Sequence, residues 1–326
     1  MRYRTLGRTG IQVSEIGLGS WGLGGGWGPK DDAEALRAME RAVELGVTFF
    51  DTALGYGNGH SENLIGRVLK GRRDKLVVAT KIPPQTGRWP VLPHEPVEDT
   101  FSAEWVIECT EKSLRNLGTD YIDVQQLHAW TPPYVQQTAW LEGLQRLKEQ
   151  GKVRAFGVSA NDWDPYGTVS LVESGLIDTI EVIYNIFEQR PAEELLPAAL
   201  RHKVGIIVRV PFEEGLLTGK LGPDHRFAKG DWRADWLTPE RLLAAAQHVE
   251  ALRAYLNADR PTLANLALKF ILSHPAVSTV IPGMRTRTHV DENVTASDGK
   301  LLSAAELESL RQHAYVHGWN YPWAQK

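Results

Sequence analysis

The chain has 326 residues, of which 42% are hydrophobic and 23% charged, which is typical of a folded globular protein and argues against a disordered chain. Its 36 Lys and Arg are balanced by 40 Asp and Glu, and the formal net charge of −4 argues against binding to nucleic acid or an anionic membrane surface. The single cysteine, Cys109, excludes an intramolecular disulfide and indicates a reducing compartment. With no signal-like core and no apolar run of about 18 residues, we expect a cytoplasmic protein that does not span a membrane.

Short apolar runs alternate with longer amphipathic segments along the chain, a pattern typical of strand–helix–strand units and a parallel sheet. After a hairpin over residues 3–13, the predicted strands are 14–18, 48–51, 76–80, 122–127, 155–159, 179–184, 205–210 and 278–281. The predicted helices are 32–45, 62–69, 103–117, 134–149, 165–174, 192–202, 239–273 with a break near Pro261, 287–292, and one more after residue 302. Eight such units predict a (β/α)8 TIM barrel. Because no linker or composition break divides the chain, we expect a single domain over residues 1–326.

Two connections, 82–102 and 211–238, are too long to be simple turns, and both follow the carboxyl ends of predicted strands. Long ordered loops at that end of a barrel are usually binding loops or lids. Residues 17–22, GLGSWG, match the dinucleotide fingerprint G-x-G-x-x-G, but further glycines follow before any helix begins. A true fingerprint opens directly onto a helix. We therefore reject a Rossmann domain and expect a flexible loop over the barrel mouth.

Polar residues at the ends of three successive apolar strands indicate a catalytic site. Asp51 ends the second strand, Lys81 follows the third and His128 follows the fourth, while Tyr56 lies in the turn after Asp51. A lysine ammonium next to a tyrosine favours the phenolate and eases proton donation, and a carboxylate would hold that lysine in place. A neutral histidine can donate a hydrogen bond to a substrate oxygen. The four residues together suit the reduction of a carbonyl, with Tyr56 as the proton donor.

The segments GLGSW, FFDTALGYGNGHSE, VVATK, DVQQLH, GVS and VIPG with a following EN closely resemble the aldo-keto reductase family, over nearly the whole chain. The resemblance implies an NAD(P)H-dependent oxidoreductase that interconverts an aldehyde or ketone and an alcohol. It matches Asp51, Tyr56, Lys81 and His128 to the family's catalytic tetrad, with Tyr56 as general acid and base. It also implies an extended cofactor across the barrel mouth without a Rossmann domain.

The same resemblance implies a set of cofactor-binding residues. They are Gly19, Ser20, Trp21, Asp51, Ser159, Asn161, Glu181, Arg209, Val210, Pro211, Phe212, Gly215, Leu217, Gly219, Lys220, Gly283, Met284, Arg285, His289, Glu292 and Asn293. Arg285 suits an adenosine 2′-phosphate, so NADPH is favoured and NADH remains possible. The family's usual Ser-Asn pair here reads Ser159-Ala160-Asn161, and Glu181 replaces a common glutamine.

Tryptophans near the predicted mouth suggest an aromatic substrate pocket for a small carbonyl or alcohol. We expect Trp21, Trp27, Trp89 and Trp130 in its wall, and further tryptophans near it at positions 232, 236, 319 and 323. Scattered histidines predict no metal site. Two alternatives remain, a nucleotide-sensing regulatory subunit on the same fold and a barrel hydrolase without a cofactor. The sequence predicts neither the physiological substrate nor the oligomeric state.

Overall fold

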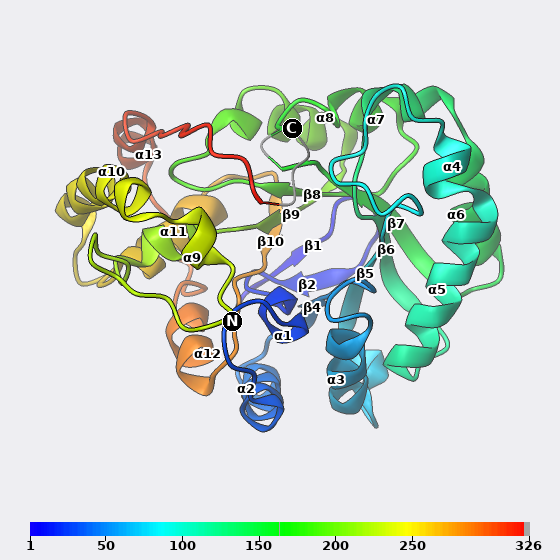
Figure 1. Cartoon of the computed structure of the whole chain (residues 1–326), viewed down its shortest axis with the longest axis horizontal. Helices are drawn as coiled ribbons and strands as arrows, with labels where there is room; N and C mark the ends of the chain where they lie inside the picture. Colours follow the sequence, from blue (N-terminus) through cyan, green and yellow to red (C-terminus); the bar gives the residue numbers. More distant parts are fainter. Residues whose placement is uncertain (163, 323–326) are drawn as a thin grey trace.

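The computed structural model describes residues 1–162 and 164–322, in which eight parallel strands form one sheet in the order of the sequence. Figure 1 shows these strands at the centre, with helices around them. The strands are β3 (Leu18–Gly19), β4 (Phe49–Asp51), β5 (Val77–Ile82), β6 (Ile122–Leu127), β7 (Val153–Ser159), β8 (Thr179–Ile183), β9 (Gly205–Arg209) and β10 (Val277–Val280).

Backbone hydrogen bonds join the first and last strands of the sheet. The amide of Gly17 donates to the carbonyl of Val280 at 2.8 Å, and the amide of Gly19 donates to that of Pro282 at 3.0 Å. Parallel bridges pair Ile16 with Val280 and Gly19 with Gly283. These bonds close the sheet into a barrel, which confirms the predicted (β/α)8 fold.

An antiparallel hairpin of β1 (Tyr3–Thr5) and β2 (Gln12–Ser14) precedes the barrel, as predicted. Its apolar residues Leu6, Ile11 and Val13 belong to the same buried cluster as Phe49 and Val124 of the barrel strands, so the hairpin plugs the amino-terminal end. The predicted strand 14–18 is wrong in its bounds. Ser14 pairs within the hairpin, and only residues 18–19 continue as β3, because the chain changes pairing partner between these positions.

The outer layer consists of amphipathic helices. Helix α5 (Ala103–Leu117) illustrates why they form: the Ser102 side chain caps its first turn by accepting from the amide of Trp105, and Gly118 ends it in a left-handed conformation. The other helices of this layer are α2 (Asp32–Glu44), α3 (His60–Leu69), α6 (Ala139–Glu149), α7 (Val169–Ser174), α8 (Leu195–His202), α11 (Leu263–Leu272) and α12 (Arg287–Val294).

Two long predicted helices are divided in the structure. The segment predicted as 134–149 contains the end of a 3-10 turn, η2 (Pro132–Gln136), and then α6. The segment predicted as 239–273 contains α10 (Pro239–Ala251), η5 (Leu252–Tyr255) and α11, so the break near Pro261 is confirmed. The helix expected after residue 302 is α13 (Ala304–Arg311), and a capping box of Ser303 and Glu306 begins it.

The glycine-rich segment and the two long connections carry short helices at the carboxyl end of the barrel. These are α1 (Trp21–Gly24), α4 (Val97–Phe101), η4 (Glu213–Thr218) and α9 (Arg233–Trp236). Gly24 packs on the turn that carries Tyr56, and a Cβ at this position would lie 2.7 Å from the Tyr56 carbonyl carbon. The chain after α13, red in Figure 1, runs back toward the barrel centre. Within the described ranges, none of the helices has both the length and the apolar character needed to cross a membrane.

Candidate active site

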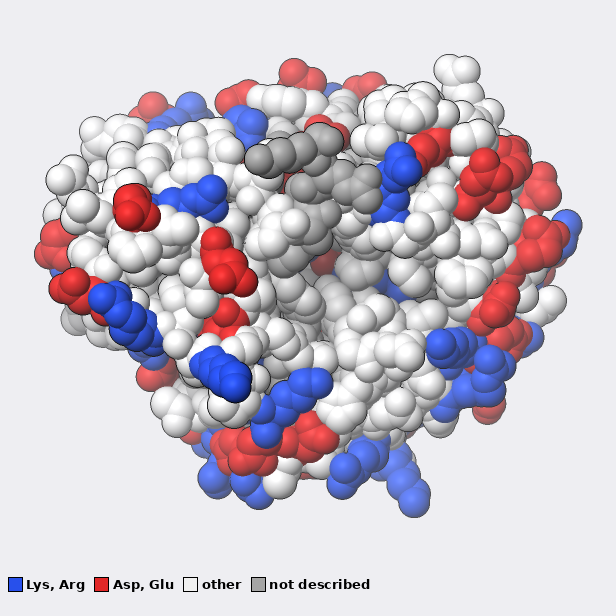
Figure 2. All heavy atoms as spheres, viewed as in Figure 1, with Lys and Arg blue, Asp and Glu red and all other residues white. Residues whose placement is uncertain are grey.

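A cavity of about 720 Å³ opens at the carboxyl ends of the barrel strands, within the size range of cofactor and ligand sites. Figure 2 shows a hollow near the middle of this face, with mostly uncharged atoms around it. Asp51, Tyr56 and His128 line the cavity, and the buried Lys81 lies between the first two. The structure therefore brings the four predicted catalytic residues together.

The Lys81 ammonium is the centre of this group. Its Nζ donates to both carboxylate oxygens of Asp51, at 2.6 and 2.7 Å, and to the backbone carbonyl of Thr52 at 2.9 Å. The Tyr56 hydroxyl lies 3.5 Å from the same nitrogen, and the His128 ring packs edge-on against the tyrosine ring at 5.6 Å. One cation thus contacts both a buried carboxylate and the expected proton donor.

The parallel register explains why these residues meet. Asp51 pairs with Ala79 of β5, two residues before Lys81, and Lys81 pairs with Gln126 of β6, two residues before His128. The carboxyl ends of three neighbouring strands therefore deliver three polar side chains to one edge of the barrel. The turn after β4 brings Tyr56 back over the same edge, with its amide donating to the carbonyl of Ala53.

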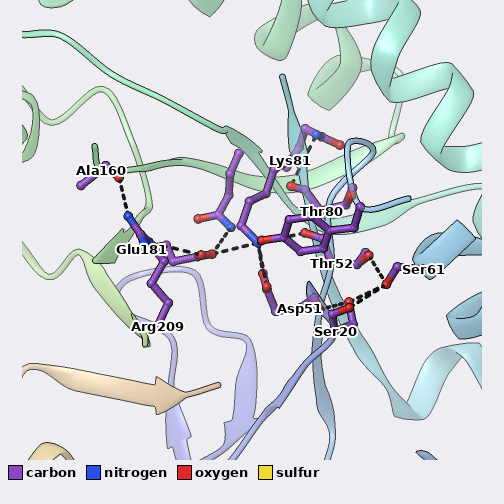
Figure 3. A network of polar contacts seen from close by, with 12 residues as sticks. Ser20, Asp51, Thr52, Ser61, Thr80, Lys81, Ala160, Glu181 and Arg209 are labelled. Carbon is purple, nitrogen blue, oxygen red and sulfur yellow. Dashed lines mark hydrogen bonds and ion pairs between the residues drawn. The ribbon is translucent and has the colours of Figure 1, made fainter. Parts of the chain in front are cut away.

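A row of buried hydroxyls holds the backbone at Asp51 in place (Figure 3). The Ser20 hydroxyl donates to the Asp51 carbonyl at 2.6 Å, the Ser61 hydroxyl donates to Ser20 at 2.6 Å, and the Thr52 hydroxyl donates to Ser61 at 2.9 Å. Ser20, predicted to bind the cofactor, is fully buried and does not line the cavity. Its observed contact is with the backbone of Asp51 in β4.

Burial has a strong effect on the protonation of the site. Burial lowers the pKa of His128 well below its ordinary value, and the charges of Lys81 and Arg209 lower it further, so the imidazole is neutral. Burial lowers the pKa of Lys81 as well, but the carboxylates of Asp51 and Glu181 outweigh burial and keep the ammonium charged.

Two opposing effects set the pKa of Tyr56. Lys81 lowers it, as predicted, but burial raises it more, and the net pKa lies above the ordinary tyrosine value. The predicted effect of the lysine is therefore present, but it is smaller than the effect of burial. Tyr56 is a protonated hydroxyl over the neutral pH range, the form that a proton donor requires.

A line of alternating charges continues from Lys81 along the cavity wall. Glu181 of β8 lies 3.3 Å from the Lys81 ammonium through Oε2 and 4.0 Å from the guanidinium of Arg209 through Oε1. The Gln126 amide donates to Glu181 at 2.9 Å, and Arg209 in turn contacts Asp162 at 2.9 Å. Sequence reasoning missed Gln126 and Asp162, although a glutamine two residues before His128 in an apolar strand was a usable signal.

The three residues of the Ser159-Ala160-Asn161 segment at the end of β7 make different contacts. Ser159 lines the cavity, and the carbonyl of Ala160 accepts from Arg209 at 2.9 Å. The Asn161 side chain instead bonds to the backbone of Trp130, donating to its carbonyl at 2.6 Å and accepting from its amide at 3.2 Å. Asn161 therefore joins two loops and does not line the cavity.

Most of the other predicted cofactor residues surround the cavity. Those in its wall are Gly19, Trp21, Asp51, Ser159, Glu181, Arg209, Val210, Pro211, Phe212, Gly215, Lys220, Gly283, Arg285, His289, Glu292 and Asn293. Ser20, Asn161, Leu217, Gly219 and Met284 are outside the wall. Leu217 and Met284 belong to the hydrophobic core, which explains their absence from it.

The connection after β9 contains strained backbone beside the cavity. Val210, Glu213 and Glu214 have φ angles of 54°, 48° and 54°, which L side chains rarely adopt. The Asn185 amide holds this segment by donating to the Val210 carbonyl at 3.0 Å and to Glu213 at 2.7 Å.

The chain after α13 is fastened to the same connection. His317 lies 2.9 Å from Glu213, and the Tyr321 hydroxyl donates to Glu214 at 2.7 Å. Burial raises the pKa of Glu214 to about 8, so this carboxyl is mostly protonated at neutral pH. Glu214 and Tyr321 both line the cavity, and sequence reasoning identified neither of them.

Three of the four predicted substrate-pocket tryptophans line the cavity. The Trp21 ring packs against Trp27 at 5.5 Å, and the Trp89 ring packs edge-on against His128 at 4.6 Å. Trp130 does not: it is buried and packs against Tyr134 and Trp140, so its ring fills the outer layer of the barrel. Trp323, also considered, lies outside the described residues.

Most of the residues expected at the adenosine also line the cavity. Arg285 donates to the carbonyl of Trp27 at 2.7 Å and is half-buried. Burial lowers the pKa of His289, so its imidazole is neutral at neutral pH. Lys220 is paired with Glu292 at 3.3 Å in an exposed ion pair.

The closed barrel, with its tyrosine, lysine, aspartate and histidine beside one cavity, defines the class of protein as a barrel oxidoreductase. Residues 15–314 match the sequence profile of the Aldo/keto reductase family. The chain belongs to the aldo-keto reductase family, which confirms the resemblance predicted from the sequence.

Known proteins agree with this assignment over nearly their full length. The chain is 32% identical to "Aldo-keto reductase YhdN" of Bacillus subtilis over 295 residues, covering 87% of this chain and 85% of the relative. It is 32% identical to the "NADH-specific methylglyoxal reductase" of Escherichia coli over 327 residues, covering 96% and 98%. The solved holo form of aldo-keto reductase AKR11C1 from Bacillus halodurans superposes with a TM-score of 0.76 at 29% identity and complete coverage of both chains. The protein is an enzyme of this family.

Proposed function

We propose that the protein reduces an aldehyde or ketone to an alcohol, and catalyses the reverse reaction, with Tyr56 as the general acid and base. The observation that carries this proposal is the Lys81 ammonium, which contacts the Asp51 carboxylate at 2.6 Å and the Tyr56 hydroxyl at 3.5 Å in the wall of the cavity. The neutral imidazole of His128 lines the same wall.

Each of these residues has a separate role in the proposed reaction. His128 donates a hydrogen bond that orients the carbonyl oxygen of the substrate toward Tyr56. Tyr56 transfers its proton to that oxygen, and the Lys81 ammonium stabilises the phenolate that remains. Asp51 holds Lys81 charged and in position. NAD(P)H, when bound, supplies the hydride for the carbonyl carbon.

The residues present fit a dinucleotide. Tyr56, Arg285 and Asn293 all lie in the wall of one cavity of about 720 Å³, large enough for a cofactor-sized ligand. The Arg209 Nε is buried in this wall without a hydrogen-bond partner among the described residues, so a polar ligand group would satisfy it. Ser159 and Arg209 would hold the nicotinamide end, and Arg285 with Asn293 the adenosine end.

NADPH is the proposed physiological cofactor. The guanidinium of Arg285 in the cavity wall can pair with a 2′-phosphate, which only NADPH carries. The neutral state of His289 leaves this preference modest. NADH stays an alternative, and the Escherichia coli relative is named as specific for it.

A small carbonyl compound with a planar or ring-shaped apolar face is the proposed substrate class. Trp21, Trp27 and Trp89 line the cavity, and the contact of Trp89 with His128 places an indole beside the catalytic imidazole. Aromatic aldehydes and sugars both present faces that pack on indole rings.

The test measures the rate of NADPH or NADH oxidation by absorbance in the presence of a panel of aromatic aldehydes, sugars and small aliphatic aldehydes. The expected result is turnover with at least one class, faster with NADPH. Cofactor binding without turnover on any compound would instead support a nucleotide-sensing regulatory subunit. Absence of both binding and turnover would contradict the proposal and favour a barrel hydrolase.

A further inference from the structure

Lys81 has more acceptors around it than it has protons to donate. An ammonium carries three N–H groups. Asp51 and the Thr52 carbonyl lie between 2.6 and 2.9 Å from its nitrogen and occupy at least two of them. Glu181 at 3.3 Å and Tyr56 at 3.5 Å remain as acceptors for the third. The second carboxylate and the proton donor therefore compete for one N–H group.

Burial and hydrogen bonding hold the Glu181 carboxylate beside Lys81. It is 1% exposed, and the Gln126 amide donates to the same oxygen that faces Lys81, at 2.9 Å. Arg209 lies near its other oxygen at 4.0 Å and is itself held by Asp162. A buried carboxylate is retained only where cations and donors compensate it, and this one has two cations and an amide. Figure 3 shows Glu181 between Lys81 and Arg209.

We propose that Glu181 is a positioning residue that competes with Tyr56 for the third N–H group of Lys81, and thereby keeps the Tyr56 hydroxyl protonated to higher pH. This inference rests on the proposed function only in its consequence for turnover. If Glu181 holds the N–H group, the Lys81 ammonium stabilises the Tyr56 phenolate less strongly. The enzyme then remains a proton donor in alkaline solution, and Glu181 sets the upper pH limit of carbonyl reduction.

The charges around Tyr56 support this direction. The charged and titratable groups that face it from the surrounding elements are Asp51 of β4, Lys81 of β5, His128 after β6, Glu181 of β8 and Arg209 of β9. Asp51 and Glu181 raise the pKa of Tyr56, while Lys81 and Arg209 lower it. Removing the charge of Glu181 leaves one carboxylate against two cations, which favours the phenolate.

The test compares the wild type with Glu181→Gln, which keeps the shape of the side chain and removes its charge. We expect the alkaline limb of the pH profile of kcat/KM for reduction to move down by at least about one pH unit. An unmoved limb in a folded Glu181→Gln protein would overturn the inference. Glu181→Asp keeps the negative charge but moves it away from Lys81 by the length of one methylene group. The alkaline limb of this variant should lie between the limbs of the wild type and of Glu181→Gln.

A matched control separates the contact from the net charge. Asp162→Asn also removes one negative charge from the line, but Asp162 contacts Arg209 and not Lys81. We expect it to move the alkaline limb by less than half as much as Glu181→Gln. An equal shift in both variants would show that net charge acts, and would overturn the proposed competition at Lys81.

A second readout needs neither cofactor nor turnover. Ionisation of Tyr56 is followed by tyrosinate absorbance after a rapid pH jump, with the matching Tyr56→Phe background subtracted from each protein. We expect Tyr56 to ionise at lower pH in Glu181→Gln than in the wild type. If Tyr56 ionises at lower pH in Glu181→Gln but neither protein turns over any carbonyl, the proposed function is refuted and the role of Glu181 is supported. If the enzyme turns over a carbonyl but the ionisation of Tyr56 does not shift, only the role of Glu181 is refuted.

Discussion

At the scale of single residues, the arrangement around Lys81 explains why a buried lysine is present in the wall of a barrel. Its ammonium is fully buried, and the carboxylates of Asp51 and Glu181 compensate that charge. The same ammonium is 3.5 Å from Tyr56, so it can stabilise a phenolate that forms during proton transfer. In the proposed mechanism, Lys81 therefore both balances buried carboxylates and stabilises the phenolate.

The first prediction concerns the proton donor. Tyr56→Phe removes the hydroxyl and keeps the ring, so turnover should fall at least about a hundredfold, in line with the loss of a general acid. The dissociation constant of the Tyr56→Phe variant for NADPH, measured by quenching of tryptophan fluorescence, should stay within about threefold of the wild-type value. This corresponds to a change of less than about 0.7 kcal/mol in the free energy of binding.

Tyr184→Phe is the matched control for this prediction. Tyr184 is also buried, but it packs between Phe270 and His274 and does not line the cavity. Its loss should leave turnover near the wild-type value. Full activity of Tyr56→Phe would show that another group donates the proton.

The sequence revealed the residues at strand ends more readily than those that act through other side chains. Asp51 and Lys81 were visible because a charged residue next to an apolar strand is costly unless it is used. Asp162 and Tyr321 gave no such signal, because each lies in a segment whose path over the barrel depends on tertiary contacts. Trp130 was misplaced for the same reason: its position near His128 in the sequence does not determine the direction of its ring.

At the scale of elements, the connection after β9 and the chain after α13 form one wall of the cavity. Glu213 is bound to His317, and Glu214 to Tyr321, so two consecutive glutamates fasten the final segment. Both glutamates have positive φ angles, a strained conformation that these side-chain bonds help to maintain. This wall therefore depends on contacts between segments about a hundred residues apart.

The second prediction concerns the pH dependence of stability at this wall. Burial raises the pKa of Glu214 in the folded protein to about 8, from 4.5 when it is solvated. Between these values the folded state holds a proton that the unfolded state releases. The Glu214 contribution is therefore fully present below about pH 4.5 and is lost as the pH rises to 8, by up to about 1.4 kcal/mol per pH unit.

The glutamine side chain of Glu214→Gln cannot titrate, so this variant should not lose this part of its stability as the pH rises. Thermal unfolding at pH 5 and pH 8 measures it: the Tm of the wild type should fall relative to that of the variant as the pH rises. Glu308→Gln, on the exposed face of α13, controls for a simple change of charge. A constant Tm difference between wild type and Glu214→Gln would contradict the protonated state of Glu214.

Element prediction succeeded where one local pattern decides the structure and failed where pairing partners change. Strand β6 was predicted at its observed bounds, because six consecutive residues form a continuous buried strand. Residues 14–18 were misassigned, because they pass from the hairpin to the barrel within five positions. The segment at 239–273 was predicted with a break near Pro261, and the structure has no helix between η5 and α11 there.

At the scale of the whole molecule, closure of the barrel brings the first and last strands together beside the cavity. Gly19 of β3 is bridged to Gly283 after β10, and both line the cavity. A cofactor that lies across this seam would contact segments from both ends of the sequence. The expectations of one domain and of a cytoplasmic location stay predictions.

The last prediction follows from this seam. A ligand that binds only the folded state stabilises it, by about 2.7 kcal/mol at a concentration of 100 Kd, so NADPH should raise the Tm. Arg285→Ala should weaken NADPH at least about tenfold, because an ionic hydrogen bond to phosphate is lost, and should affect NADH much less. The ratio of the two dissociation constants, from titrations of Tm against each cofactor, measures the preference directly.

Arg287→Ala is the control for this comparison, because Arg287 lies two residues farther along the chain and contacts Glu34 on the outside of the barrel. It should leave the ratio unchanged. Equal weakening of both cofactors by Arg285→Ala would show that the residue acts through its bond to the Trp27 carbonyl, by holding the loop in place, and not through a 2′-phosphate. In that case the cavity would have no dedicated phosphate site at Arg285, and NADH would be the better candidate for the cofactor.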